Sequence, residues 1–174
     1  GTSGYNPESN PVIMLELAPS LGFLDAHNSY LSFRIKTKDQ TVDHTKECRM
    51  DKSSMSWVKT FTITSSTGQT LENIDSYNLL CCLLTEATSP SSYKHSIGQI
   101  TDNTGNRACR NASLANPQGA VFNSGFDCSG ILSGSGRLLP LSFMQGPLTV
   151  TLTLASFNEA FVGTSMSGQT ASYQ

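Results

Sequence analysis

The chain has 174 residues, of which 14% are charged and 37% are hydrophobic, and this length suffices for one domain with a sizeable core. Its formal net charge of -2 excludes the strong positive field that attracts nucleic acid, so we expect no direct nucleic-acid binding. No run of about eighteen apolar residues occurs, so the sequence predicts no transmembrane segment. Abundant Ser, Thr, Asn and Gly favour an all-β protein with many loops.

Two strands are expected near the start of the chain. Residues 1–11 are rich in Gly, Ser, Asn and Pro and hold few apolar side chains, which is typical of a flexible N-terminal arm. Apolar residues then occupy every second position from Ile13 to Leu17 and again from Leu31 to Ile35. Because successive side chains of a strand point to opposite faces, this alternation predicts two half-buried strands.

A polar connection leads from these strands into a predicted hairpin. Residues 37–56 contain four basic residues interspersed with four acidic ones, and mixed charge of this kind is more typical of a solvated loop than of a phosphate-binding patch. Residues 57–65 then alternate in polarity, residues 66–68 form a turn, and residues 69–74 return. This pattern predicts a β-hairpin.

The polarity pattern changes after Asp75. Residues 77–84 are mostly apolar and show no alternation, so we predict one short buried helix over residues 75–86. The side chain of Asp75 is placed to cap the first turn, and Pro90 lies beyond the expected end of the helix.

Loops are expected to dominate residues 88–143. Residues 88–119 are rich in Ser, Asn, Gly and Thr, which predicts surface loops with a short strand near residues 96–101. Residues 120–126 are expected to form a strand that residues 128–132 extend. Residues 138–143 are expected to form a further short strand or extended segment.

The clearest pattern in the sequence covers residues 148–154. Four apolar residues, Leu148, Val150, Leu152 and Leu154, alternate there with three threonines. Gly146 and Pro147 interrupt the chain just before this segment. The pattern predicts a strand with one buried face and one solvated face, the unit of a half-buried antiparallel sheet.

These elements predict an all-β fold, an eight-stranded antiparallel jelly-roll sandwich with one short helix, because irregularly spaced strands and long crossovers fit this topology better than a meander. The expected organisation is a flexible N-terminal arm at residues 1–11, a jelly-roll domain at residues 12–161 and a C-terminal linker or arm at residues 162–174.

No residue pattern indicates a catalytic, cofactor-binding or metal site. The three histidines, His27, His44 and His95, lie in separate polar stretches. His44 and Cys48 have a spacing suitable for zinc, but a structural zinc site needs a second pair of ligands that the chain lacks. We therefore predict that the protein is not an enzyme and has no catalytic residues, no cofactor and no metal.

The five cysteines, Cys48, Cys81, Cys82, Cys109 and Cys128, are an odd number. Cys81 and Cys82 are adjacent in the predicted helix, and adjacent helical residues do not face each other. An odd count without a secretory pattern favours reduced thiols and a reducing compartment. We expect all five to be reduced.

Several segments together resemble a known family. They are residues 23–33, residues 58–80 with their Tyr-Asn-Leu-Leu sequence, residues 129–132, and residues 139–154 with their Leu-Pro-Leu sequence. In these segments the chain resembles a jelly-roll module of the major capsid proteins of tailless icosahedral DNA viruses, the double jelly-roll group. The resemblance covers residues 12–160 and carries over no catalytic residues. Proteins of that group contain two sandwiches, whereas this sequence predicts one.

The resemblance implies a viral capsid protein located in the virion and assembled inside the host cell. The chain is then either one half of a double jelly-roll protein or a single jelly-roll subunit, and its partners are other copies in trimeric or pseudo-hexameric capsomers and other capsid proteins. Residues 1–11, 37–56 and 162–174 are the expected interface segments. The alternative is a carbohydrate- or receptor-binding jelly roll with a ligand site on residues 88–119, where Tyr93 is the one aromatic residue.

Overall fold

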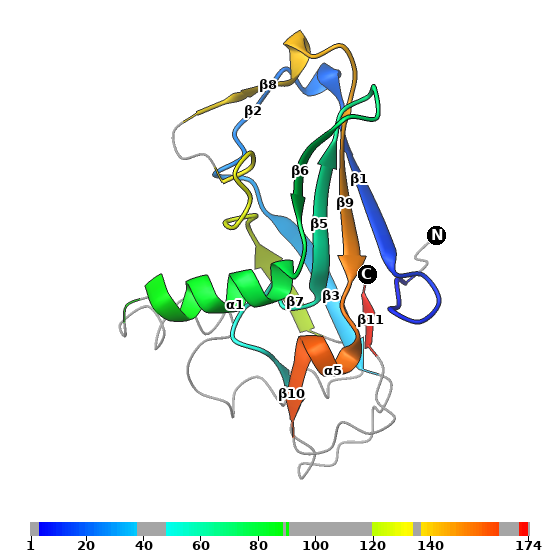
Figure 1. The fold of residues 1–174 in the computed structure, drawn as a ribbon, viewed down its shortest axis with the longest axis vertical. Helices are drawn as coiled ribbons and strands as arrows, with labels where there is room; N and C mark the ends of the chain where they lie inside the picture. Colours follow the sequence, from blue (N-terminus) through cyan, green and yellow to red (C-terminus); the bar gives the residue numbers. More distant parts are fainter. Residues whose placement is uncertain are drawn as a thin grey trace.

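The computed structural model describes residues 4–37, 48–88, 90, 120–133, 137–163 and 171–173. These residues form mostly antiparallel β-sheet with few helices, which confirms the all-β class. The molecule is elongated, and its longest strands run along the long axis (Figure 1).

The first sheet has four antiparallel strands in the order β1-β9-β5-β6. Their bounds are Val12–Leu17 for β1, Leu148–Leu154 for β9, Val58–Thr64 for β5 and Thr70–Ile74 for β6. Burial alternates along the whole of β9, with its four apolar residues buried. The strand predicted at residues 148–154 is therefore confirmed, and its predicted buried face lies in the core.

The predicted hairpin is also confirmed. Strands β5 and β6 pair antiparallel, and the turn between them is closed by the Ser65 amide, which donates to the Gln69 carbonyl at 2.8 Å. Gly68 has a φ of +82° in this turn. A residue with a Cβ rarely adopts that left-handed conformation, so glycine is the residue that suits the position.

The second sheet has the order β11-β3-β7 and packs against the first through an aromatic core. Its strands are β11 (Ala171–Tyr173), β3 (Leu31–Thr37) and β7 (Ala120–Ser124). The ring of Phe33 on β3 lies 4.8 Å from that of Trp57 and 5.8 Å from that of Phe122 on β7. Because Trp57 immediately precedes β5, these contacts join the two sheets into a sandwich.

Two small sheets extend the sandwich at its ends. At one end β2 (Phe23–Leu24) pairs with β8 (Leu139–Pro140), next to the 3₁₀ turns η1 (Pro19–Leu21) and η2 (Leu141–Phe143). At the other end β10 (Phe161–Gly163) pairs with β4 (Cys48–Met50), directly after the short helix α5 (Phe157–Ala160). The two pairs lie at opposite ends of the long axis (Figure 1).

The predicted helix exists but is not wholly buried. Helix α1 (Tyr77–Thr88) lies across the sandwich, roughly perpendicular to β5 and β6 (Figure 1). Its buried residues are Tyr77, Asn78, Cys81 and Cys82, whereas Leu79 and Leu83 are 56% and 68% exposed. The prediction of a wholly buried helix was wrong because the one polar residue of the run, Asn78, lies on the packed side, so the hydropathy pattern does not show which face packs.

The prediction of a solvated connection over residues 37–56 was wrong for its second part, residues 48–56. Residues 38–47 lie outside the described residues. Residues 48–56 hold β4 and a buried segment at residues 53–56. Its serines are buried because their short side chains find partners: Ser54 Oγ donates to Ser124 Oγ at 2.6 Å, and Ser56 Oγ donates to the Ala160 carbonyl at 2.9 Å. Buried hydroxyls that are paired in this way avoid most of their desolvation cost.

Two other expectations differ from the structure. Residues 128–132 form turns and do not extend β7. The short strand expected at residues 138–143 is limited to the two residues of β8, since η2 follows immediately. The short strand expected at residues 96–101 lies outside the described residues.

The segments predicted as terminal arms meet each other in the sandwich. The Tyr5 amide donates to the Tyr173 carbonyl at 2.8 Å, and the Tyr173 amide donates to the Tyr5 carbonyl at 2.9 Å. Tyr173 is 1% exposed, and its ring stacks on Trp57 at 5.1 Å. Both segments therefore contribute contacts to the domain.

Candidate interaction surface

The residues considered for catalysis or metal binding do not form a site in the described structure. His27 is exposed in a turn after β2, whereas His44 and His95 lie outside the described residues. Among the residues described, no group of three or more His, Cys, Asp or Glu side chains is close enough to hold a metal ion. The absence of a catalytic, cofactor or metal site stays a prediction.

Six threonines line the outer face of the four-stranded sheet. We call this set the threonine face: Thr60, Thr62, Thr64, Thr149, Thr151 and Thr153. The register places each threonine of β5 opposite one of β9, and all six are partly exposed. Because β-branched side chains are stiff and pack side by side on a pleated surface, the face presents short, ordered groups of similar size.

Strands β1 and β6 extend the threonine face on both sides. Met14, which is 66% exposed, lies opposite Thr151 in the register. On the other side, Thr62 Oγ1 donates to Asn73 Oδ1 on β6 at 2.8 Å. The row Met14, Thr151, Thr62 and Asn73 thus crosses all four strands without a charged side chain.

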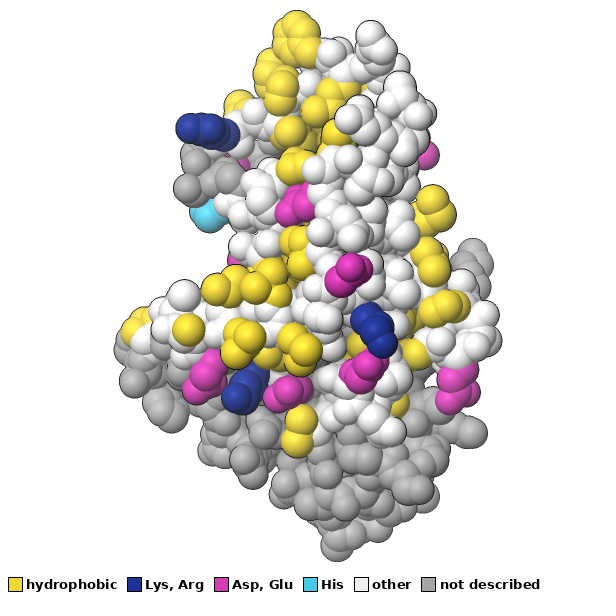
Figure 2. Space-filling model, in the orientation of Figure 1, with side chains coloured by type: hydrophobic (Ala, Val, Ile, Leu, Met, Phe, Trp, Pro, Cys, Tyr) yellow, Lys and Arg dark blue, Asp and Glu magenta, His cyan; other side chains and the backbone are white. Residues whose placement is uncertain are grey.

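A second surface is the exposed side of α1. We call Leu79 and Leu83 the leucine ridge. They are one helical turn apart and share a face, and their side chains are 56% and 68% exposed. Hydrophobic side chains gather in a band along α1 in Figure 2. An exposed apolar band of this kind marks an interaction site more often than scattered single side chains do.

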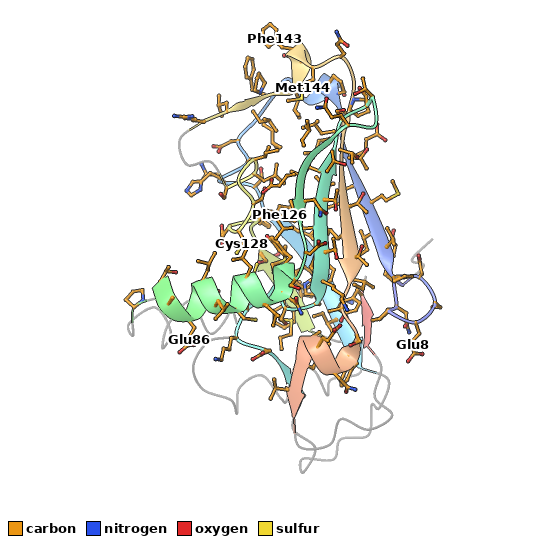
Figure 3. The ribbon with its side chains drawn as sticks, viewed as in Figure 1. Glu8, Glu86, Phe126, Cys128, Phe143 and Met144 are labelled. Carbon is orange, nitrogen blue, oxygen red and sulfur yellow. The ribbon has the colours of Figure 1, made fainter. Side chains whose placement is uncertain are left out.

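A third surface is the end of the molecule built by β2 and β8. The rings of Phe23 and Phe143 meet edge to face at 5.9 Å, although these side chains are 55% and 79% exposed. Phe143 points away from the body of the protein (Figure 3). Leu138, at 58% exposure, lies in the same part of the chain, and Figure 2 shows hydrophobic side chains gathered at this end.

An apolar groove of about 420 Å³ lies beside β1 and β3. Its apolar lining includes Leu15, Leu17, Leu31, Phe126 and Leu132. The groove is large enough for a small apolar molecule, but the described lining offers few polar groups that would orient one.

Comparison of the chain with models of protein families and with curated proteins finds no match. None of the described helices has the length and apolar composition needed to cross a membrane.

The sequence predicts interface segments elsewhere, at residues 1–11, 37–56 and 162–174, and its pattern does not indicate the leucine ridge. One sequence feature bears on the ridge: Asn78 interrupts the apolar run next to Leu79, but Asn78 is itself 6% exposed. Hydropathy therefore points to the wrong face of α1, and the exposed face becomes visible only once the helix is packed.

Proposed function

We propose that the chain is a structural subunit of a viral capsid. In this proposal it is an eight-stranded jelly-roll sandwich, either a single module or one half of a double jelly-roll major capsid protein, and it self-assembles into an icosahedral shell. Two supports are the resemblance over residues 12–160 and the antiparallel all-β sandwich. The protein is assembled inside the host cell and resides in the virion.

The observation that carries the proposal is the leucine ridge. Leu83 is 68% exposed and Leu79 is 56% exposed on a helix that projects across the sandwich. Removing apolar surface of this kind from water stabilises a complex by about 25 cal/mol for each Å² that is buried. A second protein surface placed on the ridge would supply that burial, as a neighbouring subunit does in a shell.

The threonine face supports the same proposal. Its short β-branched side chains lose little conformational entropy when they are covered, and its hydroxyls provide both donors and acceptors across an interface. The net charge of -2 also lets many copies pack without strong mutual repulsion. These properties suit a surface that meets copies of itself or of other capsid proteins.

The proposed role is structural and requires no reaction. The partners are other copies in trimeric or pseudo-hexameric capsomers and other capsid proteins, without direct contact to nucleic acid. The proposal assigns the chain no catalytic residue, no cofactor and no metal. A shell subunit needs a rigid body and lateral contacts, and the sandwich and its exposed surfaces offer both.

Assembly of the purified protein tests the proposal. The molar mass is measured by light scattering over a range of protein concentrations, and particles are sought by electron microscopy. We expect capsomer-sized oligomers that become monomers in the double variant Leu79→Glu with Leu83→Glu, while circular dichroism stays unchanged. Val121→Glu is the matched control, because Val121 is 55% exposed on a different element, β7.

Two outcomes would count against this function. A wild-type chain that stays monomeric at every concentration and forms no particles would contradict self-assembly. If the oligomers persist in the double leucine variant but dissociate in Val121→Glu, the leucine ridge is not part of the interface.

A further inference from the structure

Two cysteines far apart in the sequence lie in contact. Cys81 Sγ on α1 donates to Cys128 Sγ at 3.0 Å, across 47 positions of sequence. Cys81 is 4% exposed, and Cys128 is partly exposed. Cys128 lies in the loop that follows β7, beside α1 and close to Phe126 (Figure 3).

The helix side of this contact is held by aromatic packing. Tyr77 precedes Cys81 by one helical turn, so both side chains lie on the same face of α1. The Tyr77 ring stacks on that of Phe61 on β5 at 5.0 Å, and both residues are 0% exposed. Cys81 therefore has a fixed position over the sheet.

The loop side is held by a carboxylate from β6. The Gly130 amide donates to Glu72 Oε1 at 2.6 Å, the Ile131 amide donates to Glu72 Oε2 at 3.2 Å, and Ser129 Oγ donates to Glu72 Oε2 at 2.8 Å. These three bonds fix the residues directly after Cys128. The two sulfur atoms are thus positioned by independent contacts, which lowers the entropy lost when they are joined.

A cavity of about 320 Å³ gives access to the two sulfurs. Its lining includes Cys81, Cys128, Thr85 and Asp127, and its volume lies at the lower end of the range of small-molecule pockets. Cys82 does not line it: the Cys82 thiol instead donates to the Asp51 carbonyl at 2.9 Å. The neighbouring cysteine on the same helix is therefore directed elsewhere.

We propose that Cys81 and Cys128 are a reversible redox pair that forms a disulfide between α1 and the loop after β7, by exchange with a small-molecule disulfide. The inference is independent of the proposed capsid function. It replaces, for these two residues, the sequence-based expectation that all five cysteines are reduced.

The reaction is a two-step thiol–disulfide exchange. Cys128 loses its proton to solvent, and its sulfur attacks one sulfur of the small disulfide, so the first small thiolate leaves and takes up a proton. Cys81 then loses its proton and attacks the Cys128 sulfur, which expels the second small thiol. The two protein thiols together lose two electrons and become a disulfide, and the small disulfide accepts these electrons and becomes two thiols.

The geometry and acidity of the pair indicate this order. The Sγ atoms must approach by about 1 Å, from 3.0 Å to a bond of about 2.05 Å. The hydrogen bond to Cys128, followed by burial, raises the pKa of Cys81. A raised pKa leaves little thiolate near neutral pH, so the partly exposed Cys128 reacts first with the incoming disulfide.

Peptide mapping of the wild-type protein tests the pair. The purified chain is equilibrated in buffers with different ratios of oxidised to reduced glutathione, quenched with acid, alkylated and digested for mass spectrometry. We expect a linked peptide that contains Cys81 and Cys128, with the loss of two hydrogens, which disappears on reduction. We also expect oxidation to raise Tm by roughly 5–15 °C, as a disulfide does in a domain of this size.

Matched serine variants identify the residues. Cys82→Ser should keep both the linked peptide and the oxidation-dependent rise in Tm, whereas Cys128→Ser should lose both. The proposal is overturned if Cys81 and Cys128 stay open to alkylation at every glutathione ratio, or if a mixed disulfide on Cys128 persists without linkage to Cys81. A linkage of Cys128 to Cys82 would also overturn it. Each of these outcomes is read on the wild-type chain, so it stands even if a variant does not fold.

Discussion

Leu152 and Thr151 are adjacent on β9 and occupy opposite environments. Leu152 is 0% exposed and lies between Ile13 and Phe61 in the register, whereas Thr151 belongs to the threonine face and is partly exposed. The difference follows from the two-residue period of a strand. Substitutions at these two positions therefore measure how much core packing contributes to the free energy of unfolding.

We expect Leu152→Ala to destabilise the fold by about 2–5 kcal/mol, because it removes buried methyl groups and leaves a cavity. Thr151→Ala should cost only about 0.5 kcal/mol, as ordinary surface changes do. Urea denaturation gives both free energies of unfolding. A larger loss for Thr151→Ala than for Leu152→Ala would mean that the threonines face the core.

Glu159 on α5 carries the pH dependence that this structure predicts. Its Oε1 accepts a bond from Lys59 Nζ at 3.0 Å, and its Oε2 accepts one from the Ser156 amide at 3.1 Å. The Lys59 ammonium, followed by the Ser156 amide, holds the pKa of Glu159 below its ordinary value of 4.5. A carboxyl group with a lowered folded-state pKa stabilises the fold above its unfolded pKa, and this contribution is lost as the pH falls through the folded pKa.

We therefore expect Glu159→Gln to flatten the fall in stability as the pH drops from about 5 downward. The effect should stay below about 1 kcal/mol, because the Lys59 and Glu159 side chains are 51% and 42% exposed and water screens them. Urea midpoints measured at several pH values give the slope. Glu16→Gln, which changes an exposed carboxylate on β1, is the control, and an equal effect in both variants would contradict the assignment.

At the scale of elements, Glu72 connects β6 to the loop after β7. Its carboxylate accepts bonds from two amides and one hydroxyl of residues 129–131. We expect Glu72→Ala to destabilise the protein by about 1–3 kcal/mol, because the buried Ser129 hydroxyl and the half-buried Ile131 amide lose their acceptor. The amides of Gly130 and Ile131 should then exchange faster with deuterium.

The control for this prediction comes from the next residue of β6. Asn73 faces the opposite side of the sheet, where it accepts an exposed bond from Thr62. Asn73→Ala should leave the exchange of the Gly130 and Ile131 amides unchanged. If it accelerates them as much as Glu72→Ala does, the loop is not held by the carboxylate.

At the scale of the whole molecule, the threonine face can be separated from folding. Thr151→Arg adds a long charged side chain to a surface that is partly open to solvent. We expect the monomer to fold with an unchanged circular dichroism spectrum and oligomers to be lost, because a charge buried at an interface without a partner is strongly unfavourable. Light scattering and electron microscopy measure the loss.

Ser32→Arg is the matched control for that variant. Ser32 is exposed on β3, so the same side chain is added to the outer surface of the second sheet. It should leave assembly intact if the threonine face is the contact surface. Equal loss of oligomers in both variants would point to a general effect of added charge.

Local sequence determined most of the regular structure. Alternation at residues 148–154 predicted β9 with its buried face, and the same period predicted β1, β3 and β5. Gly68 and its neighbours predicted the hairpin turn. These features depend on contacts among neighbouring residues and on the two-residue period of a strand, so a short window of sequence contains the information.

Tertiary structure decided what depends on distant partners. The strands β4 and β11 have three residues each, too few for a period, and they form because β10 and β3 supply partners. The exposed face of α1 was set by packing, since the one polar residue of the apolar run, Asn78, is itself buried. The contact of Cys81 with Cys128 spans 47 positions, and only the folded sandwich, with Glu72 holding one side and Tyr77 the other, brings these sulfurs together.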